Sequence, residues 1–143
     1  MEQVNPYAAP KADVSEADPR AAPLSPAEML FSFEGRIGRG QYWLYALACT
    51  LVFMVLIGAV GFVIGLLAKP DSAGTVTMVI VMLLYLPLLY MLTALQAKRW
   101  HDRGKSAWWM LLALVPLANI WAAIEAGFLP GTPGRNEYGL PPR

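Results

Sequence analysis

The sequence predicts an all-α membrane protein with three transmembrane helices, and the prediction rests on three long uncharged segments and a low overall charge. Residues 41–68, 72–97 and 106–124 contain no Asp, Glu, Lys or Arg. Each segment approaches or exceeds the roughly 20 apolar residues that cross a hydrocarbon core. Charged residues make up 15% of the 143-residue chain, whereas soluble domains carry about 25%. A soluble core of this size could not bury three helices that are apolar on every side.

The N-terminal region lacks this apolar character. Residues 1–30 are predicted to form a disordered, Ala/Pro-rich cytoplasmic tail, because such a composition cannot bury enough apolar surface to fold. The first 27 residues contain five prolines and no apolar h-region, so they do not resemble a signal peptide. The membrane domain is therefore expected over residues 31–142.

The membrane domain divides into three helices and a tail. The helices are expected at about residues 42–68, 75–103 and 106–129. Gly104 suits the left-handed position after a helix end and Ser106 suits an N-cap, so a hairpin turn is predicted at 103–106. Glu125 would lie roughly 28 Å beyond Ser106 along a continuous helix, which places it at the far membrane interface. Residues 130–143 would then form an external tail.

The distribution of Lys and Arg predicts the orientation, since cytoplasmic flanks carry the excess of both. With three spans, eight of these residues share the side of the N-terminus and the second loop, and three lie on the other side. The N-terminus is therefore expected in the cytoplasm and the C-terminus outside.

The same cytoplasmic side gathers the polar candidates for a binding site. These residues form a predicted basic rim for lipid headgroups or a partner, and they are Arg36, Arg39, Lys98, Arg99, His101, Asp102, Arg103 and Lys105. Basic residues beside anionic lipid are worth about 1 kcal/mol each. Alternatively, Asp102 pairs with its basic neighbours and the cluster only fixes the orientation of the chain.

Aromatic residues and glycines have separate predicted roles. Aromatic rings collect at membrane interfaces, and the expected anchors are Tyr42, Trp43, Trp100, Trp108 and Trp109. Small residues permit close helix approach, within the chain or between copies, and the first helix offers Gly58, Gly61 and Gly65.

Familiar catalytic patterns are missing from the sequence. The Gly-Lys-Ser at 104–106 would need a glycine at position 99 to form a phosphate-binding loop, but Arg99 is there. His101 and Cys49 are the only His and Cys, and metal sites need several ligands. No G-x-S-x-G nucleophile motif occurs. We expect no metal, no cofactor and no enzymatic activity.

Three motifs together resemble the bacterial inner-membrane family of YhaH-like proteins, domain-of-unknown-function family 805. They are Phe33-x-Gly35-Arg36-x-x-Arg39-x-x-Tyr42-Trp43, then Arg99-x-His101-Asp102 with Ser106-x-Trp108-Trp109, and finally Gly131-Thr132-x-Gly134-x-Asn136-x-Tyr138-Gly139-x-x-Pro142. The motifs cover about residues 31–142. The resemblance implies a small, multi-pass protein of the bacterial cytoplasmic membrane, and it implies no activity or substrate.

The leading hypothesis is a non-enzymatic membrane protein that binds anionic headgroups or a membrane partner through the basic rim. The expected partners are membrane lipids and a second copy or another membrane protein, but no nucleic acid. A second hypothesis is an oligomeric transport or channel component, for which the few polar candidates are Thr77, Thr93, Gln96 and Asn119. A third is an enzyme acting on headgroups with His101 and Asp102 as acid and base.

Overall fold

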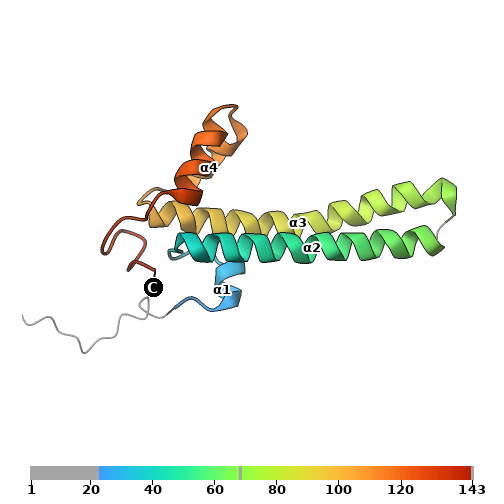
Figure 1. Ribbon diagram of the computed structural model, residues 1–143, viewed down its shortest axis with the longest axis horizontal. Helices are drawn as coiled ribbons and strands as arrows, with labels where there is room; N and C mark the ends of the chain where they lie inside the picture. Colours follow the sequence, from blue (N-terminus) through green and yellow to red (C-terminus); the bar gives the residue numbers. More distant parts are fainter. Residues whose placement is uncertain (1–22, 68, 143) are drawn as a thin grey trace, which may run out of the picture.

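The fold is a long antiparallel pair of helices with a small polar end, as seen in a computed structural model that describes residues 23–67 and 69–142. Helices α2 (Arg39–Leu67) and α3 (Pro70–Asp102) run side by side along the molecule (Figure 1). The end opposite to their connection carries α1 (Pro26–Phe31), the 3₁₀ helix η2 (Ala107–Leu114), α4 (Ala118–Phe128) and the C-terminal segment.

Two helices are long and apolar enough to cross a membrane, Arg39–Leu67 and the Gly74–Asp102 part of α3. Each has 29 residues and is thus about 43 Å long, which exceeds a hydrocarbon core of about 30 Å. Only 6% and 17% of their most apolar stretches are buried within the chain, so they are not the core helices of a soluble fold. The predicted all-helical membrane class is confirmed, with two candidate spans where three were expected.

A short helix replaces part of the expected disordered tail. The hydroxyl of Ser25 accepts a hydrogen bond from the Glu28 amide at 3.3 Å, and Glu28 Oε2 accepts one from the Ser25 amide at 2.8 Å. This capping box starts α1, and Pro26 occupies the first helical position, where its missing N–H has no helical partner to lose. The prediction of disorder is wrong for residues 26–30, and residues 1–22 lie outside the described residues.

The third apolar segment forms a hairpin instead of one helix. Helix η2 ends before Val115 and α4 begins at Ala118. Pro116 disfavours helical geometry in the residue before it, and Val115 has an extended ψ of 119°. Leu117 then adopts a left-handed φ of 68°, and the chain reverses. The prediction of a continuous helix over 106–129 is therefore wrong. We call residues 107–128 the arm.

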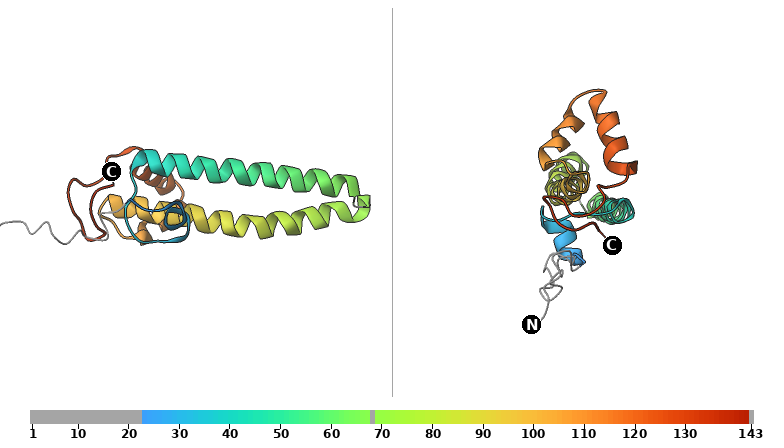
Figure 2. Two further views of the ribbon diagram at one scale, coloured as in Figure 1. Left: turned by 90° about the horizontal axis from the view of Figure 1, so that it is seen from below. Right: turned by 90° about the vertical axis from the view of Figure 1, so that its left-hand side faces the viewer.

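The arm returns to the end of the molecule from which it starts. Trp43 Nε1 donates a hydrogen bond to the Gly127 carbonyl at 3.0 Å, and the Thr132 amide donates to the Asp102 carbonyl at 2.8 Å. Figure 1 shows the arm leaving the α2–α3 pair sideways, and the end-on view in Figure 2 places it across α3 from α1. Residues 130–142 thus lie beside the 103–106 turn, and residues 106–129 contain no helix among the candidate spans of the described chain, so the predicted third span is not confirmed.

Two apolar clusters attach these parts to α3. One joins α1 and the following loop to α3 through Met29, Ile37 and Leu95. The other lies beneath the arm and consists of Trp100, Ala122 and Ala126. The C-terminal third of α3 is therefore covered on two sides, while its other turns present apolar side chains to the surroundings.

The predicted interface anchors differ in how exposed they are. Trp108 is 77% exposed and Trp43 is 48% exposed, as membrane contact requires, and Trp109 is also exposed. Tyr42 is partly buried and donates its hydroxyl hydrogen to Gln96 Oε1 at 2.7 Å. Trp100 is fully buried under the arm, so its prediction as an interface anchor is wrong.

The glycines of α2 do not pack against the rest of the described chain. A Cβ at Gly58, Gly61 or Gly65 would have no neighbour within 4 Å outside the helix itself. Close approach within the chain is therefore not their role, and contact between copies stays a prediction.

We expect Gly127→Ala to weaken the attachment of the arm to α2, because the new Cβ would lie 3.0 Å from Trp43 Cζ2. Overpacking of this kind costs about 1–3 kcal/mol. Thermal unfolding of the detergent-solubilised protein measures the effect. Gly74→Ala, where the Cβ meets open space, is the matched control, and equal midpoints for both variants would contradict the packing.

Candidate functional site

Three segments that are distant in sequence meet at the end of α3. They are residues 24–39, 98–105 and 125–142, and we call their assembly the cap. Each segment contains polar residues of one of the three sequence motifs. The cap therefore brings together most of the residues that the sequence singles out.

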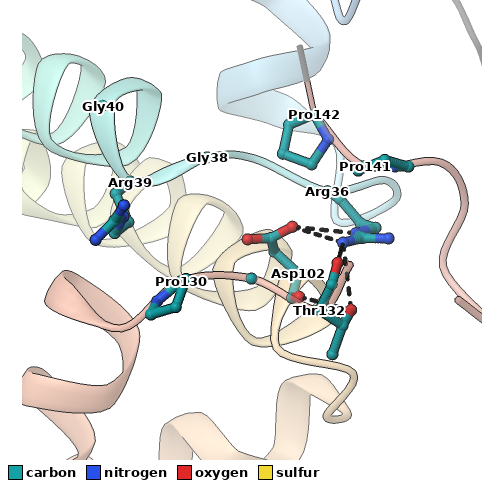
Figure 3. A pocket seen from close by; sticks show the side chains of 10 residues that line it. Arg36, Gly38, Arg39, Gly40, Asp102, Pro130, Thr132, Pro141 and Pro142 are labelled. Atoms are coloured by element: carbon teal, nitrogen blue, oxygen red, sulfur yellow. Dashed lines mark hydrogen bonds and ion pairs between the residues drawn. The ribbon is translucent and has the colours of Figure 1, made fainter. Parts of the chain in front are cut away.

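Asp102 lies at the centre of the cap, with a side chain that is 4% exposed. Its Oδ1 accepts hydrogen bonds from Arg36 Nε at 3.1 Å and Nη2 at 2.9 Å (Figure 3). Its Oδ2 accepts a hydrogen bond from Arg99 Nη1. Withdrawing each ion from water costs several kcal/mol, so such a cluster is stable only when its hydrogen bonds are complete.

The remaining donors of Arg36 hold the C-terminal segment. Nη1 donates to the carbonyl of Gly134 at 2.8 Å and to that of Gly139 at 3.2 Å. Nη2 donates to the carbonyl of Thr132 at 2.7 Å. Buried backbone carbonyls need such partners, and this segment has only one isolated β-bridge, between Asn136 and Gly139. One guanidinium group thus organises an otherwise irregular tail.

Arg99 and Lys98 bind the ends of the two short α-helices. Arg99 donates to the carbonyls of Ala126 and Leu129 at the end of α4. Lys98 Nζ donates to the carbonyl of Met29 at 2.9 Å and also to that of Ser32, at the end of α1. The last carbonyls of a helix lack intrahelical partners and attract cations. Both side chains are fully buried, so they serve the cap internally.

The tail approaches α3 too closely for a side chain at one position. A Cβ at Gly131 would lie 2.0 Å from Asp102 Oδ2, which only glycine avoids. Asn136 Nδ2 donates to the His101 carbonyl at 2.8 Å. The His101 ring stacks on Tyr138 with 3.9 Å between centroids, and its Nδ1 lies 3.2 Å from the Gly35 carbonyl. His101 therefore joins the first motif to the third.

A second ion cluster closes the base of the arm. Glu125 is 3% exposed, and its Oε1 lies 2.5 Å from Lys105 Nζ and 3.4 Å from Arg103 Nη2. The Lys105 ammonium also lies 4.4 Å from the ring centroid of Trp109 and 4.7 Å from that of Trp121, within cation–π range. The expected position of Glu125 at the far interface is wrong, because the arm folds back.

The residues of the predicted basic rim are therefore mostly internal. Five of the eight are at most 8% exposed, namely Arg36, Lys98, Arg99, His101 and Asp102. Arg103 and Lys105 pair with Glu125, while Arg39 is exposed and donates to the Phe128 carbonyl at 2.9 Å. The sequence identified the right residues for a cluster, but their partners are an aspartate and backbone carbonyls.

The site does not have the geometry of an acid–base pair. Asp102 is held between two guanidinium groups, and His101 is held by Gly35 and Tyr138.

A cavity of about 370 Å³ beside Asp102 is walled by Arg36, Arg39 and Thr132 (Figure 3). Within residues 23–67 and 69–142, no three His, Cys, Asp or Glu side chains are grouped as metal ligands.

A pair of helices long and apolar enough to cross a membrane, with an ion-paired cap at one end, defines a small integral membrane protein. Comparisons with known proteins identify its family. Residues 30–140 match the model of a protein family of unknown function, DUF805. The chain is 32% identical to the inner membrane protein YhaH of Escherichia coli K12 over 111 residues, 78% of this chain and 87% of that protein. It is 31% identical to the inner membrane protein YhaI of the same strain over 121 residues, 84% of this chain and 93% of YhaI.

The chain belongs to this family, and it is a multi-pass protein of the bacterial inner membrane. A third relative is the uncharacterized protein YiiR of E. coli K12, with 32% identity over 78% of this chain and 86% of that protein. No solved structure matches the chain.

Sequence reasoning missed two parts of the cap. Thr132 and Gly131 belong to the third motif, yet the tail that contains them was expected across the membrane. A signal for their position was available in the distribution of Lys and Arg, because ten of the eleven lie on one side of the membrane if residues 106–129 fold back. Glu125 was missed because a straight helix was assumed between it and Lys105.

We expect Asp102→Ala to destabilise the cap by about 3–5 kcal/mol, because two buried guanidinium groups would lose their common counter-charge. Thermal unfolding in detergent and protease cleavage after Arg135 measure the loss of the cap and the release of the tail.

The control for this prediction is Glu34→Ala, which removes an exposed carboxylate and should change stability by less than about 0.5 kcal/mol. Unchanged unfolding and cleavage in Asp102→Ala would show that the cap does not depend on this carboxylate.

Proposed function

We propose that this chain is a non-enzymatic membrane protein that binds lipid through its arm, which occupies the cytoplasmic leaflet beside a two-helix anchor. The observation that carries the proposal is the return of the arm to the cap after residues 115–117. The eight residues of η2 and the 11 of α4 each extend about 16 Å at 2.0 and 1.5 Å per residue. That is about half of a 30 Å hydrocarbon core.

The surface of the arm supports lipid as its surroundings. Residues 106–124 carry no charge, and Trp108, Leu114 and Leu117 are each at least 77% exposed. A helix that is apolar on every side belongs in a protein core or in a bilayer. The one charged residue of the arm, Glu125, lies at its base and pairs with Lys105 and Arg103.

The positive-inside rule supports a cytoplasmic cap and both termini on that side. All Lys and Arg except Lys69 precede the apolar part of α2 or follow residue 97, which is ten of eleven. A three-span arrangement would divide the same residues eight to three. Since the excess of Lys and Arg marks the cytoplasmic side, two spans and a one-leaflet arm fit the sequence better than three spans.

An arm in one leaflet has a mechanical consequence. It adds apolar volume to the cytoplasmic leaflet without adding any to the other. Amphipathic helices that insert apolar side chains into one leaflet bind in a way that depends on curvature and lipid composition, and the arm shares this one-sided insertion. We therefore propose that the protein senses or promotes curvature of the cytoplasmic leaflet. This replaces headgroup binding by the basic rim, since most rim residues are bound within the cap.

The other hypotheses draw less support. The separate partners of His101 and Asp102 favour a structural role for both over headgroup hydrolysis. Gln96 accepts a hydrogen bond from Tyr42 between α3 and α2, and Thr93 donates to the Tyr90 carbonyl of its own helix. These bonds favour a packed anchor over a polar lining for transport.

We expect a cysteine at position 135 to be labelled from the same membrane side as one at position 15. The test uses Arg135→Cys, Ser15→Cys and Lys69→Cys, each in a Cys49→Ser background, and a membrane-impermeant maleimide on spheroplasts and inverted vesicles. Arg135→Cys and Ser15→Cys should react only in inverted vesicles, and Lys69→Cys only in spheroplasts.

Labelling of Arg135→Cys from the outside would restore the three-span arrangement and remove the arm from one leaflet. Lys69→Cys is the internal control for orientation, because the α2–α3 connection lies at the far end of both helices.

We expect the protein to concentrate in small vesicles over large ones when it is reconstituted with the cap outward. Replacing the exposed Leu114 and Leu117 with Lys should abolish this preference, because a charged tip is costly in hydrocarbon. Fluorescence of the labelled protein per membrane area measures the ratio. Equal densities for the unmodified protein at all vesicle sizes would contradict curvature sensing.

A further inference from the structure

An exposed aromatic patch lies where the end of α1 meets α3, on the side of α3 away from the arm (Figure 2). It consists of Phe31, Phe33 and Tyr90, which are 54%, 37% and 44% exposed. The Phe31 ring stacks on the Tyr90 ring with 6.5 Å between centroids, and the Phe33 ring meets it edge-on at 5.4 Å. The three rings therefore form one continuous apolar surface.

The aromatic patch lies beside the membrane-crossing part of α3. Tyr90 belongs to the uncharged segment 72–97 and precedes Lys98, where the charged end of α3 begins, by eight residues. Eight residues of helix rise about 12 Å. The neighbouring Leu86 and Leu89 are 62% and 43% exposed, as expected of a helix that lipid surrounds. The surroundings of this part of α3 therefore also reach the rings that α1 adds to it.

The backbone at the end of α1 suits surroundings that contain little water. The Tyr90 hydroxyl donates a hydrogen bond to the Phe31 carbonyl at 2.9 Å. Lys98 Nζ donates to the carbonyl of Met29 at 2.9 Å and also to that of Ser32. A helix end ordinarily leaves such carbonyls to water, whereas hydrocarbon requires a partner within the protein for each of them. Side chains of α3 supply that partner to three carbonyls.

Charged residues on either side limit how deep the aromatic patch can lie. Glu28 precedes it and Glu34 follows it along the chain, and both are exposed. A carboxylate within hydrocarbon is costly. Tyr is enriched at the boundary between headgroups and hydrocarbon, and interfacial segments bury Phe side chains at the same depth. The aromatic patch therefore suits this boundary, in the leaflet next to the cap.

We propose that Phe31, Phe33 and Tyr90 form a second lipid contact, which inserts the end of α1 among the upper acyl chains of the leaflet next to the cap. Lipid is favoured over a protein partner because the patch continues the exposed apolar surface of a candidate span. The proposal does not depend on the membrane position of the arm, since it uses only α1 and α3.

The test is fluorescence quenching of a nitrobenzoxadiazole label on Phe31→Cys in the Cys49→Ser background. The full chain is placed in nanodiscs of phosphatidylcholine and phosphatidylglycerol, which leave both membrane faces open to solutes. The quenchers are aqueous iodide and phosphatidylcholines that carry a nitroxide near the top or near the end of one acyl chain. We expect strong quenching by the upper nitroxide and weaker quenching by the lower one.

The matched control is the same label on Glu137→Cys, because Glu137 is exposed on the C-terminal segment of the cap. Iodide should quench the label at position 31 severalfold less than the label at position 137. A melting temperature equal to that of Cys49→Ser shows that each labelled variant is folded. If Phe31→Cys melts lower, Phe33→Cys carries the label instead.

Two results would overturn the proposal. Equal iodide quenching at positions 31 and 137 would mean that the aromatic patch faces water. Protection from iodide without quenching by either nitroxide would mean that protein, such as a second copy of the chain, covers the rings in place of lipid.

Discussion

The carboxylate of Asp102 is the constraint on which the cap depends. It stands between Arg36 from the loop before α2 and Arg99 from α3. Each guanidinium group then uses its remaining donors on carbonyls of the C-terminal segment or of α4. A buried ion cluster of this kind needs all of its hydrogen bonds, so the cap forms when its three segments are all present.

This arrangement separates the roles of charge and apolar surface. Most of the cations hold the cap together through buried hydrogen bonds, whereas the arm exposes Trp108, Leu114 and Leu117 and buries Ala122 and Ala126 against Trp100. In the proposed function, association with the membrane rests on apolar area, both along α2 and α3 and along the arm.

Sequence reasoning identified the residues of the cap better than their roles. Arg36, Lys98, Arg99 and Asp102 were singled out because charges between long apolar segments are conspicuous. Their main partners are backbone carbonyls at helix ends and in the tail, and a carbonyl has no signature in the sequence. The capping box of α1 was readable from Ser25 and Glu28 at a spacing of three, but the surrounding prolines suggested disorder.

The sequence by itself determined the class of the protein and two long membrane helices, because long uncharged segments can be recognised directly. It also placed the first two motifs at the same end, because one motif precedes the first of these helices and the other follows the second. The direction of the third apolar segment was decided only by the tertiary structure. A straight span and a folded arm have the same hydropathy, and Pro116 is compatible with a kink or a reversal. Glu125 distinguishes the two, since its carboxylate needs Lys105 and Arg103 beside it, and only the folded arm brings them together.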